Sequence, residues 1–285
     1  MQNDKLQTQD KAIVLGGGGI TGIAWESGII ASLISAGINL AEADTILGTS
    51  AGAFVGSALA SGYDMEDYYA MQQGGNSEEP SISASLMTRL LWIKAFVYGG
   101  KKQNKIGKSL GRIAQNHPSK VSLDERLAIV RSRLVVKTFP PKLKVTAIDA
   151  LSGETHLFDD QSGISLEQAV AASGAVPGVW PSISFNGTTW IDGGMISSTN
   201  ALLVQNSKKI IILSPLPKRN GFIPGAFEDA EKLKDHAEVF LFTPDEKSKE
   251  AIGANIYDTT NCKACANAGY EQGKNACNEV LKMWR

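Results

Sequence analysis

The sequence lacks the long apolar runs and the charge excess that mark membrane-spanning and nucleic-acid-binding proteins. No stretch approaches the roughly 18 apolar residues that cross a bilayer, and residues 1–10 are polar, without the apolar core of a signal peptide. The formal net charge is −1, from 28 Lys and Arg against 29 Asp and Glu, which gives no reason to expect nucleic acid as a partner. We therefore expect a cytoplasmic protein without a signal peptide or transmembrane segment; peripheral membrane contact or release by a specialised secretion route stays open.

Cysteine is also scarce, and its placement argues against a fold built on disulfide bonds or zinc. The chain has three cysteines near its C-terminus: Cys262, Cys265 and Cys277. A C-x-x-C pair followed by a third cysteine could hold zinc, but a structural zinc site normally takes four ligands, and no histidine lies nearby. We expect reduced thiols on a C-terminal helix rather than a metal site, and a disulfide bond stays open. No metal and no organic cofactor are expected.

Strands and helices alternate through the first part of the chain. Apolar residues 11–15 and 43–47 each read as a short buried strand, followed by the helical stretches 22–36 and 51–61. Strands that alternate with helices at this spacing predict a parallel sheet covered by helices on both faces. Asp64 is expected to cap a further short helix. More strands are expected at 143–150, 154–158, 209–213 and 239–242, and more helices at 123–134 and from a cap at Ser165 through Ala172.

Residues 74–122 are expected to form helices only. Within this helical insertion, a helix that includes Leu86, Trp92 and Val97 is apolar over much of its circumference, and three lysines follow it between residues 101 and 105. Such a helix is either a buried core element or a lid that rests on lipid with its lysines at the level of the headgroups. The second interpretation assigns a peripheral membrane contact to residues 82–105 and makes Trp92 one of the residues that contact lipid.

A G-x-S-x-G motif lies where the second strand meets the following helix. Gly48, Ser50 and Gly52 form this motif. At such a junction the two glycines permit a tight turn, and the serine is held where a substrate carbonyl can reach it. Ser50 is therefore a candidate nucleophile, and the N–H of Ala51 is a candidate oxyanion donor.

Four consecutive glycines follow the first strand. Gly16 to Gly19, with Gly22 three residues further on, expose a row of backbone N–H groups at the start of a helix, which suits an anion. The anion is a phosphate or a developing oxyanion, and the oxyanion donors would be Gly17, Gly18 and Gly19. The spacing from Gly17 to Gly22 also satisfies G-x-G-x-x-G, but the acidic residue that a dinucleotide site needs after its second strand is absent.

An aspartate followed by two glycines supplies a candidate base. Asp192, Gly193 and Gly194 follow a short apolar stretch, and a carboxylate within hydrogen-bond reach of a serine can take its proton. Asp149, at the end of a predicted strand, is a rival acid. It ranks lower because no glycine pair follows it.

A catalytic triad would need a histidine as well. His117 lies in a polar loop, His156 in a predicted hairpin and His236 in a charged stretch. None of them belongs to a glycine-rich motif, so we expect all three at the surface and a Ser50-Asp192 dyad in place of a triad. An α/β-hydrolase with Ser50, an aspartate and His236 is an alternative, but that fold usually places its nucleophile after several strands, and Ser50 follows only the second.

Together, the glycine loop, the G-x-S-x-G motif and the D-G-G motif resemble the patatin-like phospholipase family. The resemblance covers residues 11–200 and includes the segment 172–178, which is similar to the segment before the family's catalytic acid. It implies an α/β fold, a three-layer α/β/α sandwich with a mainly parallel central sheet, and a serine–aspartate dyad. One departure is visible: the family often has Lys or Arg just before the last glycine of the loop, where this chain has Thr21.

The resulting hypothesis is a serine-dependent hydrolase of carboxylic esters, of the phospholipase A, lysophospholipase or esterase type, that acts on phospholipids or related acyl esters. It assigns a patatin-like domain to residues 11–243, including the helical insertion or lid 74–122. Residues 244–285 are expected to form a C-terminal helical extension packed on the same domain. The alternative from another class is a nucleotide- or phosphate-binding module that uses Gly16 to Gly22 without hydrolysis. A degenerate, noncatalytic member of the family is a third hypothesis.

Overall fold

A computed structural model describes residues 10–74, 83–219, 221 and 223–285. The strands in this part of the chain are β1 Lys11–Leu15, β2 Thr45–Gly48, β3 Leu143–Asp149, β4 Thr155–Phe158, β5 Ile183–Phe185, β6 Thr188–Asp192, β7 Lys209–Leu213 and β8 Glu238–Phe242. They form one sheet in the order β5-β6-β3-β2-β1-β7-β8, with β4 paired to β3 outside this path. Strands β3, β2, β1, β7 and β8 are parallel, whereas the pairs β3–β4, β3–β6 and β5–β6 are antiparallel.

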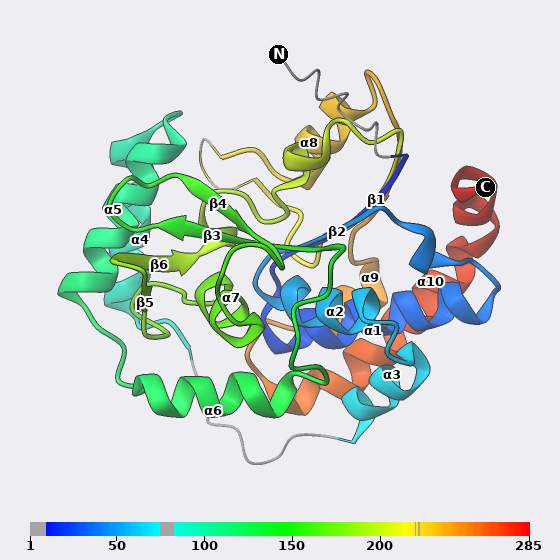
Figure 1. Cartoon of the computed structure of the whole chain (residues 1–285), viewed down its shortest axis with the longest axis horizontal. Helices are drawn as coiled ribbons and strands as arrows, with labels where there is room; N and C mark the ends of the chain where they lie inside the picture. Colours follow the sequence, from blue (N-terminus) through cyan, green and yellow to red (C-terminus); the bar gives the residue numbers. More distant parts are fainter. Residues whose placement is uncertain (1–9, 75–82, 220, 222) are drawn as a thin grey trace.

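Helices cover both faces of this sheet (Figure 1). One side carries α1 Gly19–Ser35, α2 Ala51–Ala60, α3 Met65–Gln73, α6 Leu123–Arg133, α7 Leu166–Ser173, α9 Glu246–Ile252 and α10 Cys262–Trp284. The other side carries α4 Leu86–Gly99, α5 Gln103–Asn116, α8 Ala226–Leu233 and the short 3-10 helix Ala201–Val204. The predicted three-layer α/β/α sandwich with a mainly parallel sheet and a helical insertion is therefore confirmed. None of the helices in the described residues is long and apolar enough to cross a membrane.

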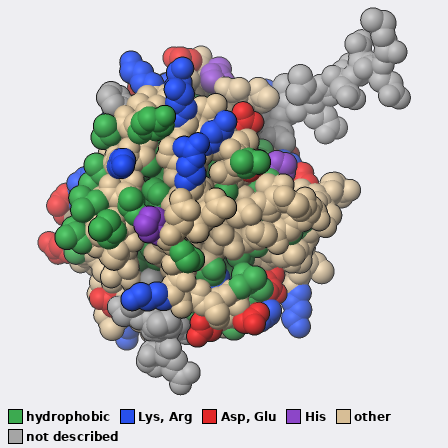
Figure 2. Space-filling model, turned by 90° about the vertical axis from the view of Figure 1, so that its left-hand side faces the viewer, with side chains coloured by type: hydrophobic (Ala, Val, Ile, Leu, Met, Phe, Trp, Pro, Cys, Tyr) green, Lys and Arg blue, Asp and Glu red, His purple; other side chains and the backbone are tan. Residues whose placement is uncertain are grey.

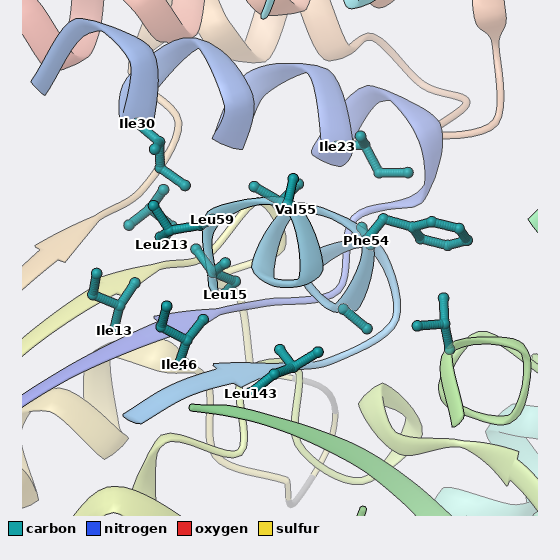
Figure 3. Packing of buried hydrophobic residues seen from close by; sticks show 14 of the residues in the cluster. Ile13, Leu15, Ile23, Ile30, Ile46, Phe54, Val55, Leu59, Leu143 and Leu213 are labelled. Atoms are coloured by element: carbon teal, nitrogen blue, oxygen red, sulfur yellow. The ribbon is translucent and has the colours of Figure 1, made fainter. Parts of the chain in front are cut away.

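Side chains that alternate along the strands fill both interfaces between helices and sheet. Ile13 and Leu15 of β1 pack in the cluster that also contains Val55 of α2 and Ile30 of α1 (Figure 3). Val14 points to the opposite face and packs with Ala230 and Leu233 of α8. Strands buried on both faces read as continuous apolar runs, which is why residues 11–15 and 209–213 were recognisable from the sequence.

One edge of β3 carries two strands end to end, and this arrangement positions the candidate site. β2 pairs with the first half of β3, where Gly48 lies opposite Val145. β6 pairs with the second half, where Asp192 lies opposite Ala147. β4 occupies the other edge along both halves. Because β2 runs parallel and β6 antiparallel to β3, their carboxyl ends meet on this edge, about 7 Å apart along β3.

The predicted strands 11–15, 43–47, 143–150, 154–158, 209–213 and 239–242 are confirmed to within two residues at each end. The helix after the glycine loop begins at Gly19, three residues before the predicted start. The β5–β6 hairpin was not predicted, because its two strands are short. Asp64 and Ser165 cap α3 and α7 as predicted. Of the expected helical insertion, the loop from 75 to 80 and Ile82 lie outside the described residues.

Helix α10 packs closely along α1 through small residues. A Cβ atom added at Gly269 would overlap the carbonyl group of Trp25, and one added at Gly273 would overlap Ser32. In the other direction, a Cβ atom at Gly28 would overlap the backbone of α10 at Ala266. The two helices are therefore held at a separation that only glycine permits at these positions.

We expect Gly269→Ala to lower the free energy of unfolding by about 3 kcal/mol, because the added methyl group must push the two helices apart. Thermal and urea unfolding followed by circular dichroism measures this change. Gly74→Ala is the matched control: Gly74 has φ −72°, and the nearest atom to its added Cβ lies at 3.6 Å. Equal stabilities of the two variants would contradict the expected helix contact.

Candidate active site

Ser50 occupies a strained turn between β2 and α2. Its backbone has φ +52° and ψ −110°, a region that side chains rarely adopt and that is found mainly at functional sites. Gly48 and Gly52 make this turn feasible. A Cβ atom at Gly48 would lie 2.6 Å from Ala53 Cα, and one at Gly52 would overlap the carbonyl group of Leu15. The sequence motif therefore forms the sharp strand-to-helix turn that was predicted from it.

The amide of Ser50 is itself held in place. It donates a hydrogen bond to Ser173 Oγ at the end of α7, at 2.8 Å. Ser173 is fully buried, and a Cβ atom at the neighbouring Gly174 would lie 3.8 Å from Ser50 Oγ. The segment 172–178, which was singled out in the sequence, thus lies directly against the candidate nucleophile.

The glycine loop lies on the other side of Ser50, with the N-terminus of α1 behind it. A Cβ atom at Gly17 would be 3.6 Å from Ser50 Cβ. The Gly17 N–H donates to the Ser198 carbonyl oxygen at 2.8 Å, so a donor role of Gly17 would require this bond to break. The amides of Gly18 and Gly19 are among the first N–H groups of α1, which have no acceptor within the helix, and among the described residues no other acceptor contacts them.

Two buried side chains fix this loop. Glu26 is fully buried, and its Oε1 accepts a hydrogen bond from the Gly16 N–H at 2.9 Å. Burial raises the pKa of Glu26 well above its ordinary value, and the hydrogen bond from Gly16 opposes this rise. Thr21, the position where the family often has a basic residue, is fully buried and donates from Oγ1 to the Ile256 carbonyl oxygen at 3.3 Å. Thr21 therefore ties the glycine loop to the segment before α10.

Asp192 lies at the end of β6, within reach of Ser50. Asp192 is 3% exposed, and its Oδ1 accepts a hydrogen bond from the Gly194 N–H at 2.6 Å. Loss of solvent on burial raises the pKa of Asp192 to about 7, and the Gly194 N–H, the nearby Ser50 hydroxyl group and the charge of Arg126 oppose this rise. Gly193 must be glycine, because a Cβ atom there would overlap Thr146.

A polar network joins the ends of the strands around the site. The Asn200 side-chain amide donates to Thr49 Oγ1 at 3.1 Å, to Thr146 Oγ1 at 3.3 Å and to the Gly193 carbonyl oxygen at 3.1 Å. Thr49 and Thr146 also share a hydrogen bond of 2.8 Å. All of these side chains are buried. Because Thr49 precedes Ser50 and Gly193 follows Asp192, the network fixes the turn and the D-G-G loop relative to each other.

A small cavity adjoins Ser50. Its volume is about 20 Å³, close to the space that one water molecule needs. The N-termini of both α1 and α2 reach it, through Gly19 and Ala51. Because helix N-termini carry partial positive charge, the cavity favours a negative charge beside Ser50. The other lining residues are Ile20, Ile23, Phe54, Arg126, Arg133, Gly174, Val176, Trp180 and Tyr257.

Two arginines seven residues apart on α6 line this cavity. The guanidinium of Arg126 lies 4.2 Å from the centre of the Trp180 ring, and its Nη2 is 3.5 Å from the Gly174 carbonyl oxygen. The Arg126 side chain is 3% exposed. Arg133 lies over the Phe54 ring at 5.9 Å. The site therefore contains basic side chains although Thr21 is not basic; they come from a different helix.

The segment before α10 closes the cavity from the C-terminal side. The Ile256 carbonyl oxygen accepts the Thr21 N–H at 3.2 Å, and Tyr257 lines the cavity. Burial and the nearby charge of Asp192 raise the pKa of the Tyr257 phenol, so it stays protonated. Residues far from the three motifs thus complete the walls around Ser50.

The other candidate residues lie elsewhere. His117, His156 and His236 are exposed, as predicted, and none of them lines the cavity beside Ser50. Asp149 Oδ1 accepts the Leu151 N–H within its own turn at 2.8 Å and lines a separate groove. No base other than Asp192 among these candidates reaches Ser50.

The cysteines lie on or beside the contact of α10 with α1. Cys262 and Cys265 are buried and Cys277 is partly exposed, and burial raises the pKa of the Cys265 thiol to about 12. The thiols of Cys265 and Cys277 form no disulfide bond. Within the described residues, no group of three or more His, Cys, Asp or Glu side chains is arranged to hold a metal ion.

Sequence reasoning missed several of these residues. In the sequence, Arg126 is one charged residue of an amphipathic helix, and Asn200 and Tyr257 belong to no motif. The one signal that could have found Arg126 and Arg133 is their i, i+7 spacing, which places both on one face of a helix. The roles of Asn200 and Tyr257 depend on contacts between segments remote in sequence and leave no local pattern.

Comparison with solved structures finds distant similarity to larger proteins. VipD from Legionella pneumophila matches 95% of this chain at 14% identity and a TM-score of 0.47, and the match spans 67% of VipD. ExoU in its complex with SpcU, from the type III secretion system of Pseudomonas aeruginosa, matches 96% of this chain at 18% identity and a TM-score of 0.44. The chain spans 52% of that ExoU chain. No curated protein sequence matches the chain.

The sequence model of one family covers much of the chain. The model described as patatin-like phospholipase matches residues 13–204, about two thirds of the 285 residues. The matched range includes the glycine loop, the Ser50 turn and Asp192. The chain belongs to the patatin-like phospholipase family.

Proposed function

We propose that the chain is a lipid acyl hydrolase that cleaves carboxylic esters of phospholipids or related lipids through a Ser50-Asp192 dyad. The observation that carries the proposal is the closeness of the Ser50 hydroxyl group to the buried Asp192 carboxyl group, whose pKa it lowers, beside the converging N-termini of α1 and α2. This arrangement combines a nucleophile, a base and a positively polarised region at one point, which acyl transfer requires. Membership of the patatin-like phospholipase family supports the same reaction class.

In the proposed acylation step, Ser50 Oγ attacks the ester carbonyl carbon while the Asp192 carboxylate takes the hydroxyl proton. The carbonyl oxygen becomes negative, and the N–H groups of Gly18, Gly19 and Ala51 would donate hydrogen bonds to it. Collapse of the tetrahedral intermediate breaks the ester C–O bond. The proton on Asp192 passes to the departing oxygen, and the acyl group stays on Ser50.

In deacylation, water attacks the acyl carbon and Asp192 takes one of its protons. When the bond to Ser50 Oγ breaks, this proton returns to Ser50 and the acyl group leaves as a carboxylic acid. The raised pKa of Asp192, about 7, suits both steps, because a base whose pKa lies near the working pH can accept and return a proton efficiently.

The proposal is tested by a lipid-class profile of the purified protein. Release of fatty acid from phospholipids, lysophospholipids and a p-nitrophenyl ester is measured together with labelling by a fluorophosphonate, which reacts with activated serines. We expect hydrolysis and labelling in the wild type and neither in Ser50→Ala. An unlabelled, inactive wild type that binds NAD or ATP in calorimetry would favour the nucleotide-binding alternative.

The surroundings of the glycine loop do not favour that alternative. A Cβ atom at Gly18 would lie 2.5 Å from Pro215, and one at Gly19 would lie 2.5 Å from the Ile256 carbonyl oxygen. Protein atoms therefore occupy the space beside the loop that a pyrophosphate would need. The α/β-hydrolase alternative lacks its imidazole, because His236 is exposed and does not line the cavity.

Arg126 is expected to position the phosphate of a phospholipid substrate. Its guanidinium lines the same cavity as Ser50, and a charge-assisted hydrogen bond to phosphate contributes about 1.5–3 kcal/mol. We expect Arg126→Gln to lower kcat/KM for a phospholipid by about tenfold to a hundredfold, chiefly through KM, and to change hydrolysis of an uncharged short ester much less.

The control for this prediction is Arg131→Gln on the same helix, where Arg131 is exposed and pairs with Glu167. The Arg131→Gln variant should hydrolyse both substrates at the rate of the wild type. Thermal unfolding of both variants separates loss of function from loss of fold. An equal loss on the charged and the uncharged substrate would assign Arg126 a structural role instead.

A further inference from the structure

Helix α4 presents two apolar faces. The face toward the protein packs Ala95 and Phe96 against α5 and the sheet. The opposite face is open to solvent. Its large apolar side chains are between 52% and 77% exposed, a fraction that is unusual for a whole helix face. We call these residues the α4 outer face: Leu86, Met87, Leu90, Ile93, Val97 and Tyr98.

Trp92 lies on the side of α4 that packs against the protein. The Trp92 indole N–H donates to the Pro177 carbonyl oxygen at 3.1 Å, and the ring packs against the clusters that contain Phe96 and Val176. Trp92 is therefore partly buried against the protein, as expected if this helix is a core element. The residues that could contact lipid are those of the α4 outer face.

Positive charge is concentrated around this face. Between residues 83 and 120 the chain has eight Lys and Arg and no Asp or Glu, whereas the rest of the sequence has 20 Lys and Arg against 29 Asp and Glu. All eight basic residues are exposed. The space-filling view of this side shows hydrophobic side chains next to a group of Lys and Arg (Figure 2). The eight are Arg89, Lys94, Lys101, Lys102, Lys105, Lys108, Arg112 and Lys120.

A surface groove joins the two features. It has a volume of about 340 Å³ and runs between α4 and α5. Lys94 and Arg112 contribute cationic groups to its walls, and Leu91, Tyr98 and Ile113 contribute apolar surface. A phospholipid headgroup carries its phosphate directly beside the start of its acyl chains, and this groove offers partners for both.

The α4 outer face also lies close to the candidate active site. The inner side of α4 contacts the segment 176–180, which forms one wall of the Ser50 cavity. Trp92 donates its hydrogen bond to this segment. Thr88 also packs against it, because its Cγ2 atom would lie 3.0 Å from a Cβ atom at Gly178. Val176 and Trp180 of that segment line the cavity. Only one helix therefore separates the exposed apolar face from the wall beside Ser50.

We infer that the α4 outer face and the surrounding basic residues form a docking surface for an anionic phospholipid bilayer. Apolar side chains would enter the acyl boundary while lysines and arginines contact phosphate groups, as in other interfacial helices. Anionic lipid is favoured over a second copy of this chain, because two copies facing each other here would bring together like charges on and beside α4, among them Arg89, Lys94 and Arg112. That docking delivers substrate to Ser50 rests on the proposed function. Docking itself does not require hydrolysis.

The test is sedimentation with vesicles, carried out in the Ser50→Ala protein so that no lipid is consumed. Vesicles of phosphatidylglycerol and phosphatidylcholine in equal amounts are compared with pure phosphatidylcholine. We expect Ile93→Gln/Val97→Gln to weaken binding to the anionic vesicles about tenfold or more, because both side chains lose their insertion into the bilayer. The matched control, Leu203→Gln/Phe227→Gln, replaces two exposed apolar residues elsewhere and should bind like the parent.

A second set of variants tests the charges. Lys101→Gln/Lys102→Gln/Lys105→Gln should weaken binding to anionic vesicles by about a hundredfold, since each cation near an anionic surface strengthens binding about fivefold. The control, Lys218→Gln/Lys247→Gln/Lys263→Gln, removes three exposed lysines from other parts of the chain. Thermal unfolding confirms that each variant is folded.

Binding that is unchanged in the α4 variants, or equally weakened in the controls, would overturn the inference. A change of oligomeric state in Ile93→Gln/Val97→Gln without a change in vesicle binding would also overturn it and would assign the face to a second copy. Because binding is measured without catalysis, failure of the Ser50-Asp192 proposal would leave this result intact, and failure of docking would leave hydrolysis of soluble esters intact.

Discussion

Ser50→Ala is expected to abolish ester hydrolysis, with a fall in kcat on the order of 10⁴ to 10⁶. Without the hydroxyl group no acyl-enzyme can form, because no other atom of this side chain can attack the ester carbonyl carbon. The measurement is release of fatty acid from phospholipid and from a soluble ester, together with labelling by fluorophosphonate. Ser61→Ala, at the other end of α2, is the matched control, because the Ser61 hydroxyl donates only within its own helix.

The strained backbone at Ser50 also predicts how substitutions there change the free energy of unfolding. Alanine keeps the Cβ atom that makes φ +52° unfavourable, whereas glycine adopts this φ readily. We therefore expect Ser50→Gly to be as inactive as Ser50→Ala but more stable than it by about 1 kcal/mol. Full activity in either variant would remove the nucleophile role. Equal stability of the two variants would indicate that the turn is not strained.

Asp192→Asn is expected to lower kcat by about 10² to 10⁴, because the amide cannot take the proton of Ser50. The fold should persist, since the amide oxygen can still accept the Gly194 N–H. Asp149→Asn is the control, because Asp149 lies outside the Ser50 cavity. Retained activity in Asp192→Asn, measured with the soluble ester, would show that another group takes the proton.

The same residue predicts opposite pH dependences of activity and stability. Hydrolysis needs the ionised carboxylate, so activity should rise through pH 7, where Asp192 ionises. The folded pKa of Asp192, about 7, lies above the ordinary value of 3.8, so the folded state binds the proton more tightly than the unfolded state. The stability that this preference provides is fully present below pH 3.8 and is lost as the pH rises through 7.

The Asp192→Asn variant should not lose stability as the pH rises through 7, because the asparagine side chain does not ionise. Its free energy of unfolding should exceed that of the wild type above pH 7 by up to about 4 kcal/mol and should match it near pH 4. Urea unfolding at the two pH values measures the difference. A variant less stable than the wild type at high pH would contradict the cause assigned to the raised pKa, which is loss of solvent around the carboxylate.

The turn at Ser50 could be predicted from the sequence because its causes are local. Gly52 is needed for its contact with Leu15 of the remote strand β1, but Gly48 is needed for contacts with Gly52 and Ala53, only a few residues away. The same holds for the caps at Asp64 and Ser165. Where the contacts that fix a conformation lie within a few residues, the local residue pattern predicts that conformation.

The sequence could not show which amides of the glycine loop are available as donors, because this depends on remote groups. Gly17, Gly18 and Gly19 are alike in the sequence, but the Ser198 carbonyl oxygen engages the amide of Gly17. The carbonyl oxygen of Ile256 engages the amide of Thr21 and leaves that of Gly19 without a backbone acceptor among the described residues. No pattern within the glycine run can reveal which of its amides another segment will contact.

The buried face of helix α4 likewise could not be predicted from the sequence. Its sequence is apolar on nearly every side, so helical periodicity does not mark which face is buried. Packing against α5 and against the segment 176–180 decides this, and it places Trp92 inside and Ile93 outside. The membrane hypothesis was available from composition, but the residues that carry it were not.

The amino-acid sequence by itself determined the order of most strands and helices and the turn at Ser50, and it singled out Asp192 as the candidate acid, because short-range sterics and apolar periodicity act along the chain. The tertiary structure alone decided that Ser50 and Asp192 meet: β2 and β6 share one edge of β3 and end facing each other. It also brought Arg126, Asn200 and Tyr257 to the site. Pairing between strands and packing between helices join residues that are more than a hundred positions apart, and such contacts leave no mark in the local sequence.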